Sequence, residues 1–168
     1  TFVVLAVLFR SIVIPFKAVV LNVLSLLASF GALVLVFQDG WFANVLRFEP
    51  LGFIEATLPI ILFALLFGLS MDYEVFLLSR VKEAYDEGHS NTDSVAVGLE
   101  RSGSVITSAA LVVIVVCLAF VTADIVLIKA VGLGAAIAVF VDAAIVRSLL
   151  VPATMRLLGR WNWWVPSW

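Results

Sequence analysis

Four long apolar stretches divide the chain, and polar residues gather in the shorter segments between them. A helix needs about 20 consecutive apolar residues to cross the hydrocarbon core of a bilayer. Residues 18–37, 56–79, 104–122 and 125–150 have about that length, so each stretch predicts one transmembrane helix. No stretch shows the sustained alternation of polar and apolar residues that is typical of a membrane β-strand. The pattern therefore predicts an all-α membrane protein, a polytopic transmembrane helix bundle with four full spans.

The segments outside these spans also carry structural signals. Residues 1–9 are apolar but reach only about half the length of a span, so we interpret them as the end of a fifth membrane helix within a larger protein. Residues 80–103 form a polar loop region that predicts a continuation of the second span, a break at 88–91, and a helix leading into the third span. Either Thr92 or Asp93 is expected to cap that last helix.

Aromatic residues mark two segments as interfacial. Residues 41–48 contain Trp and Phe side chains at spacings that suit a short helix lying in the membrane interface. Residues 151–168 form a tail in which tryptophans lie beside Arg160, a pattern typical of an anchor at the lipid headgroups. The tryptophans of this tail are Trp161, Trp163, Trp164 and Trp168.

The distribution of basic residues predicts how the chain is oriented. Short cytoplasmic loops of membrane proteins carry an excess of Lys and Arg. When the predicted helices are threaded through the membrane, only Arg47 and Lys129 fall on one side. Residues 80–103, the tail and the C-terminus are therefore expected to be cytoplasmic, and residues 38–55 to be outside. The basic residues of the cytoplasmic side are Arg10, Lys17, Arg80, Lys82, Arg101, Arg147, Arg156 and Arg160.

The composition supports a membrane protein and argues against several kinds of site. The 168 residues are 64% hydrophobic, whereas soluble domains are about 45–50% apolar. Cys117 is the single cysteine, so no disulfide can form within the chain. The single histidine, His89, lies in a polar segment, and the sequence contains no catalytic constellation or phosphate-binding loop. We therefore expect no enzyme activity, no metal or other cofactor, no use of ATP and no nucleic-acid partner.

Polar residues from all four spans fall at a similar depth in the membrane. At a rise of about 1.5 Å per residue, Asp72 lies about 7 Å and Asp142 about 6 Å to the cytoplasmic side of the middle of its span. Hydroxyl side chains also pack between membrane helices, so the two acids carry most of the argument for a polar layer. The other members of this layer, at about 4–9 Å from the middle, are Asn22, Ser25, Thr107 and Ser108.

Asp72 is the strongest candidate for a functional group. A carboxylate at this depth costs several kcal/mol if it faces lipid, so we expect it to face the bundle interior or water. Burial disfavours the ionised form, and an acid that binds and releases protons is what a proton-coupled machine needs. A static ion pair or a hydrogen bond between helices is the alternative. Tyr73 can offer a hydroxyl to a neighbouring acid, and Phe76, one turn from Asp72 on the same face, is a possible gate for water.

Asp142 is either a second relay group or part of a structural polar layer, and its candidate partner is Arg147. Five residues is a poor spacing on an α-helix, because the two side chains lie about 140° apart. Arg147 is therefore expected to reach the cytoplasmic headgroups or to meet another helix. Glu74 follows Asp72 by two residues and points to nearly the opposite face, where we expect a cation near the interface to pair with it.

The stretch GLSMDYEVFLLSR, residues 68–80, resembles the signature of the MMPL family, the mycobacterial-membrane-protein-large branch of the resistance–nodulation–division (RND) superfamily. The stretches SVAVGLERSGSVITSAALVV and VDAAIVRSLLVPATMRLLGRWNWWVP are also similar to that family. The resemblance implies twelve membrane helices in two halves, each half with a large extracytoplasmic domain. The four spans then correspond to the ninth to the twelfth helix. It further implies that Asp72 and Tyr73 face a second Asp-Tyr pair on the fourth helix and relay protons with it.

The resemblance implies that the parent protein exports lipids, glycolipids or other hydrophobic molecules across the bacterial inner membrane, driven by the proton-motive force. The expected partners are membrane lipids, the hydrophobic cargo, and the N-terminal half and extracytoplasmic domains of the same protein. A non-transporting membrane module, such as a lipid- or sterol-sensor-like domain or a scaffold, is the alternative function. The acid within the membrane favours proton-driven transport over that alternative.

Overall fold

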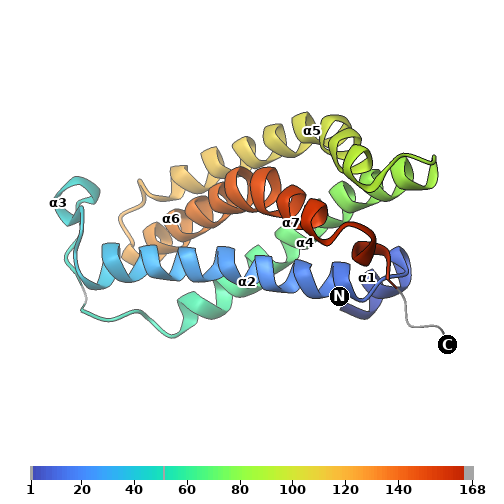
Figure 1. Cartoon of the computed structure of the whole chain (residues 1–168). Helices are drawn as coiled ribbons and strands as arrows, with labels where there is room; N and C mark the ends of the chain where they lie inside the picture. The colour runs from blue at the N-terminus through green and yellow to red at the C-terminus, as the bar shows by residue number, and fades with distance from the viewer. Residues whose placement is uncertain (1, 51, 165–168) are drawn as a thin grey trace.

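The computed structural model describes residues 2–50 and 52–164, which form a bundle of long helices (Figure 1). Four helices of the described chain are long and apolar enough to cross a membrane, and no strand is present in these residues. The prediction of an all-α bundle with four spans is therefore confirmed. Thr1, in the predicted first helix, and Trp168, in the predicted tail, lie outside the described residues. The four helices are Val13–Gln38, Thr57–Asp86, Asn91–Phe120 and Val126–Leu158.

Two of these helices contain a π-helical segment, and short helices precede or follow the long ones. The α4–α5 connection is short, because helical structure extends through most of residues 80–103. The elements in chain order are α1 (Phe2–Phe9), α2 (Val13–Leu33), the π-helix η1 (Val34–Gln38), α3 (Ala43–Leu46), α4 (Thr57–Asp86), α5 (Asn91–Phe120), α6 (Val126–Val141), the π-helix η2 (Asp142–Leu150), α7 (Val151–Leu158) and the 3₁₀-helix η3 (Gly159–Trp163).

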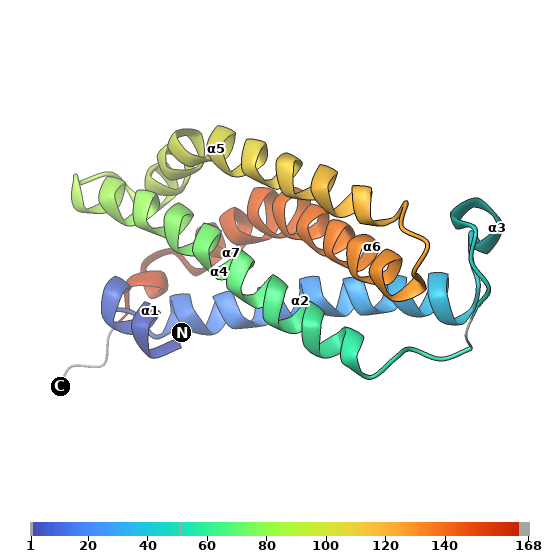
Figure 2. The same ribbon diagram turned by 180° about the vertical axis from the view of Figure 1, so that it is seen from behind.

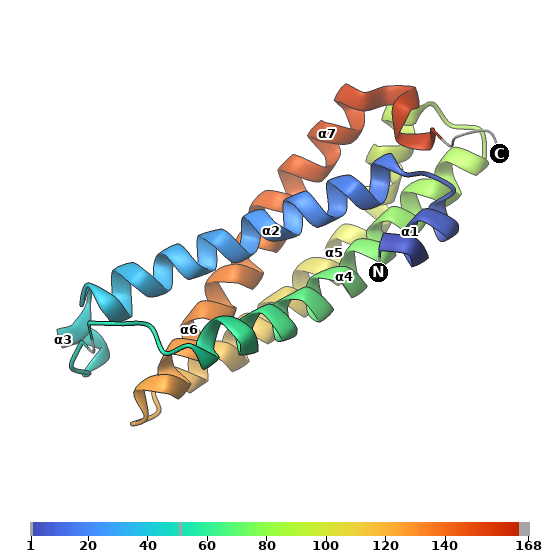
Figure 3. The ribbon, with the colours of Figure 1, turned by 90° about the horizontal axis from the view of Figure 1, so that it is seen from below.

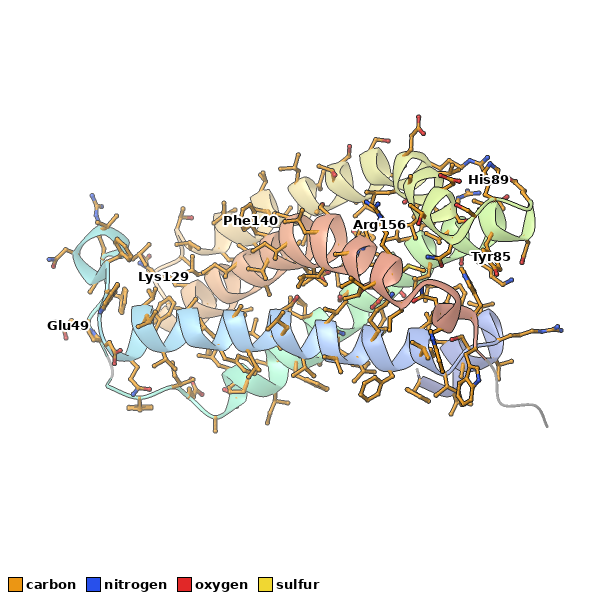
Figure 4. The ribbon with its side chains drawn as sticks, viewed as in Figure 1. Glu49, Tyr85, His89, Lys129, Phe140 and Arg156 are labelled. Atoms are coloured by element: carbon orange, nitrogen blue, oxygen red, sulfur yellow. The ribbon has the colours of Figure 1, made fainter. Side chains whose placement is uncertain are left out.

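The bundle has two distinct ends. The helix formed by α6, η2 and α7 lies between α2 and α5 (Figure 1), and the view from behind shows α4 crossing α2 (Figure 2). The end that carries α1 and η3 also carries the α4–α5 turn, whereas α3 and the α5–α6 turn lie at the other end (Figure 3). Side chains at each end identify them: His89 and Tyr85 at the first end, Lys129 and Glu49 at the second (Figure 4).

The start of α5 is set by a serine. Ser90 has an extended backbone, with φ −61° and ψ 158°, and its hydroxyl oxygen accepts a hydrogen bond of 3.2 Å from the backbone N–H of Asp93. The same hydroxyl donates to the Asp93 carboxylate at 2.7 Å. This arrangement satisfies an N–H group that the first helical turn leaves without a partner. The predicted cap at Thr92 or Asp93 is therefore wrong by a few residues, and Asp93 supports the cap instead of forming it.

Glycine allows the helices to approach closely at two places. A Cβ atom added at Gly98 of α5 would lie 2.8 Å from the backbone nitrogen of Val81 in α4. A Cβ atom added at Gly132 of α6 would lie 2.5 Å from the carbonyl oxygen of Cys117 in α5. Both distances are too short for a real contact, so a larger residue would push the helices apart. Small residues at helix contacts are a common basis of packing in membrane bundles.

Two lysines of the long helices, Lys17 and Lys129, are buried. Lys17 lies inside α2, because this helix begins earlier than predicted, and only 6% of the residue is exposed. Lys129 of α6 donates from Nζ to the carbonyl oxygens of Leu46 and Arg47. These carbonyls are at the C-terminal end of α3, where a cation is favourable. Lys17 was expected beside the turn that precedes the first full span, but its side chain lies within the bundle.

Asn162 holds η3 against the rest of the bundle. Its residue is fully buried, and its side-chain Nδ2 donates to the carbonyl oxygens of Met155 at 2.6 Å and Gly159 at 2.8 Å. The backbone carbonyl of Asn162 accepts a 2.6 Å hydrogen bond from the hydroxyl of Ser11, which lies between α1 and α2. The end of the described chain is thereby joined to its beginning.

Trp163 continues this attachment. Its ring stacks on Tyr85 at the end of α4, with 4.4 Å between ring centroids and an interplanar angle of 17°. Its indole Nε1 donates to Oδ1 of Asn91 at the start of α5, at 3.1 Å. Trp163 therefore packs against the protein, and its predicted role as a headgroup anchor stays a prediction. Trp161 and Trp164 are exposed, so the predicted anchoring role stays a prediction for these two residues.

Candidate functional site

Polar side chains on one face of α4 are buried in the bundle, and Asp72 lies on the opposite, exposed face. Ser70 and Glu74, four residues apart, are 7% and 5% exposed. Asp72 is two residues from each of them, about 200° around the helix axis, and it is exposed. Glu74 does lie on the face opposite Asp72, as predicted. Within this chain Glu74 faces the interior and Asp72 does not, so a position of Asp72 against the interior of the complete protein, or against water, stays a prediction.

The outward face of α4 around Asp72 is open. Leu65 is 44% exposed, Gly68 is exposed, and a Cβ atom added at Gly68 would meet no atom within 4 Å. A carboxylate in the middle of a membrane-length helix is costly when lipid surrounds it. This face therefore has the chemistry of a surface that protein or water covers in the membrane.

Behind that face, three helices bring polar side chains to one small cavity of about 10 Å³. This volume is close to what a single water molecule requires. Apolar residues, among them Leu66 and Val139, form the rest of its lining. We refer to the polar members as the buried polar cluster: Asn22 and Ser25 from α2, Ser70 and Tyr73 from α4, and Asp142 and Arg147 from η2.

Arg147 is the centre of this cluster. It is 3% exposed, and its Nη2 donates to Oδ2 of Asp142 and to the carbonyl and hydroxyl oxygens of Ser70, at 2.7 and 3.1 Å. The hydroxyl of Ser70 donates to Asp142 at 3.0 Å. The guanidinium carbon of Arg147 lies 4.9 Å from the ring centroid of Tyr73, within the range of a cation–π contact. Arg147 thus meets another helix, and the alternative expectation of a headgroup contact is wrong.

The contact between Asp142 and Arg147 depends on the π-helix. A π-helix closes hydrogen bonds from residue i to residue i+5, so side chains five residues apart return to the same face. Ser148 shows the same relation, because its hydroxyl donates to the carbonyl oxygen of Ala143 at 2.8 Å. The expected 140° separation assumed an α-helix, and this assumption fails over Asp142–Leu150.

A second pair of charges, Lys17 and Glu74, is buried beside the cluster. Lys17 is 6% and Glu74 5% exposed, and neither Lys17 Nζ nor Glu74 Oε1 has a hydrogen-bond partner among the described residues. The charges of Lys17, Arg147 and Asp142 all act on the Glu74 carboxylate. Glu74 therefore has a nearby cation, as expected, but Lys17 lies within the bundle and the two charged groups are not in contact.

Sequence reasoning did not predict that Lys17 and Glu74 would lie inside. The available signal was the spacing of four residues between Leu62, Leu66, Ser70 and Glu74, all of which are buried. A repeat of four residues marks one face of a helix. The signal is weak in this chain, because the lipid-facing side of α4 is also apolar.

Thr107 and Ser108 do not join the polar cluster. Both are exposed, because α5 turns Ser102, Ile106 and Ala110 toward its neighbours. The predicted layer therefore includes Asn22, Ser25 and Asp142 but not these two residues of α5.

Phe76 is partly buried on the side of α4 that carries Asp72, and its ring centroid is 5.5 Å from the guanidinium carbon of Arg80.

The described residues contain no group of three His, Cys, Asp or Glu side chains placed as metal ligands. The polar side chains of this region are carboxylates, cations, hydroxyl groups and the amide of Asn22.

The profile of the MMPL family matches residues 1–168. The mycolic acid-containing lipids exporter MmpL11 of Mycolicibacterium smegmatis is 46% identical over 167 residues, covering 99% of this chain and 17% of that protein. The heme uptake protein MmpL11 of Mycobacterium tuberculosis is 45% identical, with the same coverage. The trehalose monomycolate exporter MmpL3 of Mycobacterium tuberculosis is 42% identical over 168 residues, 100% of this chain and 18% of that protein. With its four membrane-length helices and its match over every residue, the chain belongs to the MMPL family.

Proposed function

We propose that this chain is the C-terminal membrane part of an exporter that moves lipid or other hydrophobic cargo across the bacterial inner membrane, driven by the proton-motive force. Two relatives are named as exporters of lipids that contain mycolic acid or of trehalose monomycolate. The chain spans 17–18% of the length of these relatives. The cargo path and the partner of Asp72 therefore belong to the longer protein.

The observation that carries the proposal is the position of Asp72. Asp72 is an acid on the exposed face of a membrane-length helix. Gly68, one turn away on the same face, has no side chain and no neighbouring atom within 4 Å of an added Cβ. Such an acid can bind a proton from one side of the membrane and release it to the other. A membrane potential of about 100 mV contributes about 2.3 kcal/mol for each charge that crosses the full field. Phe76, on the same side of α4, is the proposed gate for water.

Tyr73 connects Asp72 with the buried polar cluster. It follows Asp72 in α4, and its ring packs against Arg147. A change in the charge of Asp72 therefore acts on a neighbour that contacts the Asp142–Arg147 pair, the second possible part of the relay. Coupling requires that the protonated and ionised forms of the acid favour different packings of the helices. The contact between Tyr73 and Arg147 supports a path for this coupling from α4 to η2.

The first test replaces Asp72 in the full-length protein. Asp72→Asn keeps the shape of the protonated acid and cannot titrate, so export should be abolished while expression and membrane insertion stay near normal. Asp72→Glu should retain part of the activity with a changed pH dependence. Tyr73→Phe should weaken export less than Asp72→Asn if the hydroxyl only orients the acid. The measurement is export of labelled cargo from cells, normalised to the amount of protein in the membrane.

Asp124→Asn is the matched control, because Asp124 is an exposed acid in the turn between α5 and α6. Its export should equal that of the wild type. Normal proton-dependent export by a well-expressed Asp72→Asn protein would remove Asp72 from the relay and overturn the proposed mechanism.

A further inference from the structure

Four of the buried charged residues, Lys17, Glu74, Asp142 and Arg147, form two pairs of different geometry. Asp142 and Arg147 are in direct contact, and Ser70 adds a hydrogen bond to each: its hydroxyl donates to the carboxylate and its carbonyl oxygen accepts from the guanidinium. Lys17 and Glu74 are buried to a similar degree, but Lys17 Nζ and Glu74 Oε1 have no hydrogen-bond partner among the described residues. The charges of the first pair are thus in contact and hydrogen-bonded, whereas those of the second pair are not.

The two charges of a static buried ion pair are expected to be in direct contact and hydrogen-bonded. Removing two charges from water costs several kcal/mol per ion, and only close contact with further hydrogen bonds offsets this cost. Asp142 and Arg147 meet that condition, whereas Lys17 and Glu74 do not. A buried acid that no donor holds is free to change its protonation state. Water can reach such groups, because ordered water pairs with buried polar atoms that lack protein partners.

We propose that Glu74 is a second proton-binding group of the transporter, with Lys17 as the cation that balances its ionised form. The inference rests on the proposed function, because it assigns the group a step in proton movement. Neither Glu74 nor Lys17 is on the outward face that carries Asp72. The proposed site is therefore a separate one, between α2 and α4, on the side of the cluster nearer the α4–α5 turn.

The proposed step is a simple proton exchange. A hydronium ion gives its proton to a carboxylate oxygen of Glu74, an O–H bond forms, and a water molecule is released. When all four groups are ionised, two positive and two negative charges cancel. Binding one proton leaves the site with a net charge of +1, which favours a different arrangement of Lys17 and Arg147.

The groups that face Glu74 define its electrostatic environment. Lys17 approaches from α2, and Asp142 and Arg147 approach from η2. The buried residues of α5 on the side of α4 are uncharged, as Gly98 and Ile106 illustrate. Asn22 of α2 adds a buried Nδ2 without a hydrogen-bond partner among the described residues. Lys17 and Asn22 are separated by about 7.5 Å along the helix axis, so polar atoms continue from the Glu74 region to the cavity of the buried polar cluster.

The test uses the full-length protein in lipid vesicles and reads protonation directly. Infrared difference spectra are recorded across a pH titration, and the carbonyl stretch of a protonated carboxylic acid is followed. We expect Glu74→Gln to remove one such band that Asp72→Asn retains. Loss of the same bands in both variants, or no loss in Glu74→Gln, would show that Glu74 does not bind a proton. This readout needs no transport, so it separates the inference from the proposed function.

Transport by the same variants supplies the second readout. Glu74→Gln should lower proton-coupled export about 100-fold, the lower end of what a positioned proton-transferring group contributes. Glu74→Asp should restore activity with a changed pH profile. Lys17→Met combined with Glu74→Gln removes both charges and avoids an unpaired buried ion, and it should stay inactive. Recovery of export in this double variant would show that the pair is only structural, and the proposed role of Glu74 would be wrong.

Discussion

At the scale of the residue, the cost of burying charge explains how the polar cluster is built. One nitrogen of Arg147, Nη2, donates to three acceptors, the Asp142 carboxylate, the Ser70 carbonyl and the Ser70 hydroxyl. A guanidinium offers five N–H donors in a fixed plane, which suits a site where several acceptors converge. Lysine would present a compact point charge and lacks the planar group that lies against the Tyr73 ring.

Loss of Arg147 should therefore be far more damaging than loss of a surface arginine. Arg147→Met leaves the Asp142 carboxylate buried without its partner, which should lower the free energy of unfolding by about 3–5 kcal/mol. Arg101→Met is the matched control, because Arg101 pairs with Glu87 at 3.4 Å on the surface and such pairs contribute about 1 kcal/mol or less. Denaturant unfolding of the purified full-length protein measures both values. Equal losses would show that the buried pair is not held as described.

At the scale of the element, the apolar composition predicts that four helices cross the membrane but not which face of each helix is inside. In α4 the lipid-facing side is as apolar as the core, and only Ser70 and Glu74 distinguish the inner face. The contact of Asp142 with Arg147 could not be predicted from the sequence, because it requires a π-helix in place of an α-helix. A shift of helix type changes which residues share a face without changing the hydropathy of the segment.

The contact between α4 and α5 gives a test at this scale. Gly98→Ala places a Cβ atom against the backbone of Val81, so it should destabilise the bundle by about 1–3 kcal/mol. Gly103→Ala is the control on the same helix, because its added Cβ would meet no atom within 4 Å. That variant should be neutral or slightly stabilising, since alanine favours a helix by up to about 1 kcal/mol over glycine. Thermal unfolding in detergent compares them, and similar behaviour of both variants would contradict the close approach at Gly98.

At the scale of the whole molecule, we propose that other parts of the complete protein cover the exposed face around Asp72. The sequence predicted that an acid in the membrane must be covered, and that prediction concerns the complete protein. Within the four spans, the same helix α4 buries Glu74 and exposes Asp72. Sequence reasoning identified the helix and its polar residues, but the choice between its two faces depends on how the other helices pack.

The orientation of the bundle is a prediction at this scale as well. The excess of Lys and Arg predicts that the α4–α5 turn is cytoplasmic and that α3 is outside. A cysteine at His89 should be protected from a membrane-impermeant thiol reagent in intact cells, and a cysteine at Glu49 should react. The two residues lie at opposite ends of the bundle (Figure 4), and the native Cys117 is buried. Labelling at His89 with protection at Glu49 would mean that the proposed orientation is inverted.

The attachment of η3 has a consequence for the order in which this region forms during synthesis. Ser11 and Asn162, which share a hydrogen bond, are 151 positions apart, and Trp163 meets Tyr85 and Asn91 from the same late segment. A ribosome delivers Asn162 and Trp163 only after all four spans have been made. These contacts of the α1–α2 turn and of the start of α5 can therefore form only after Asn162 and Trp163 have been synthesised. A premature stop codon before Asn162 would therefore leave this end of the bundle without the contacts of η3.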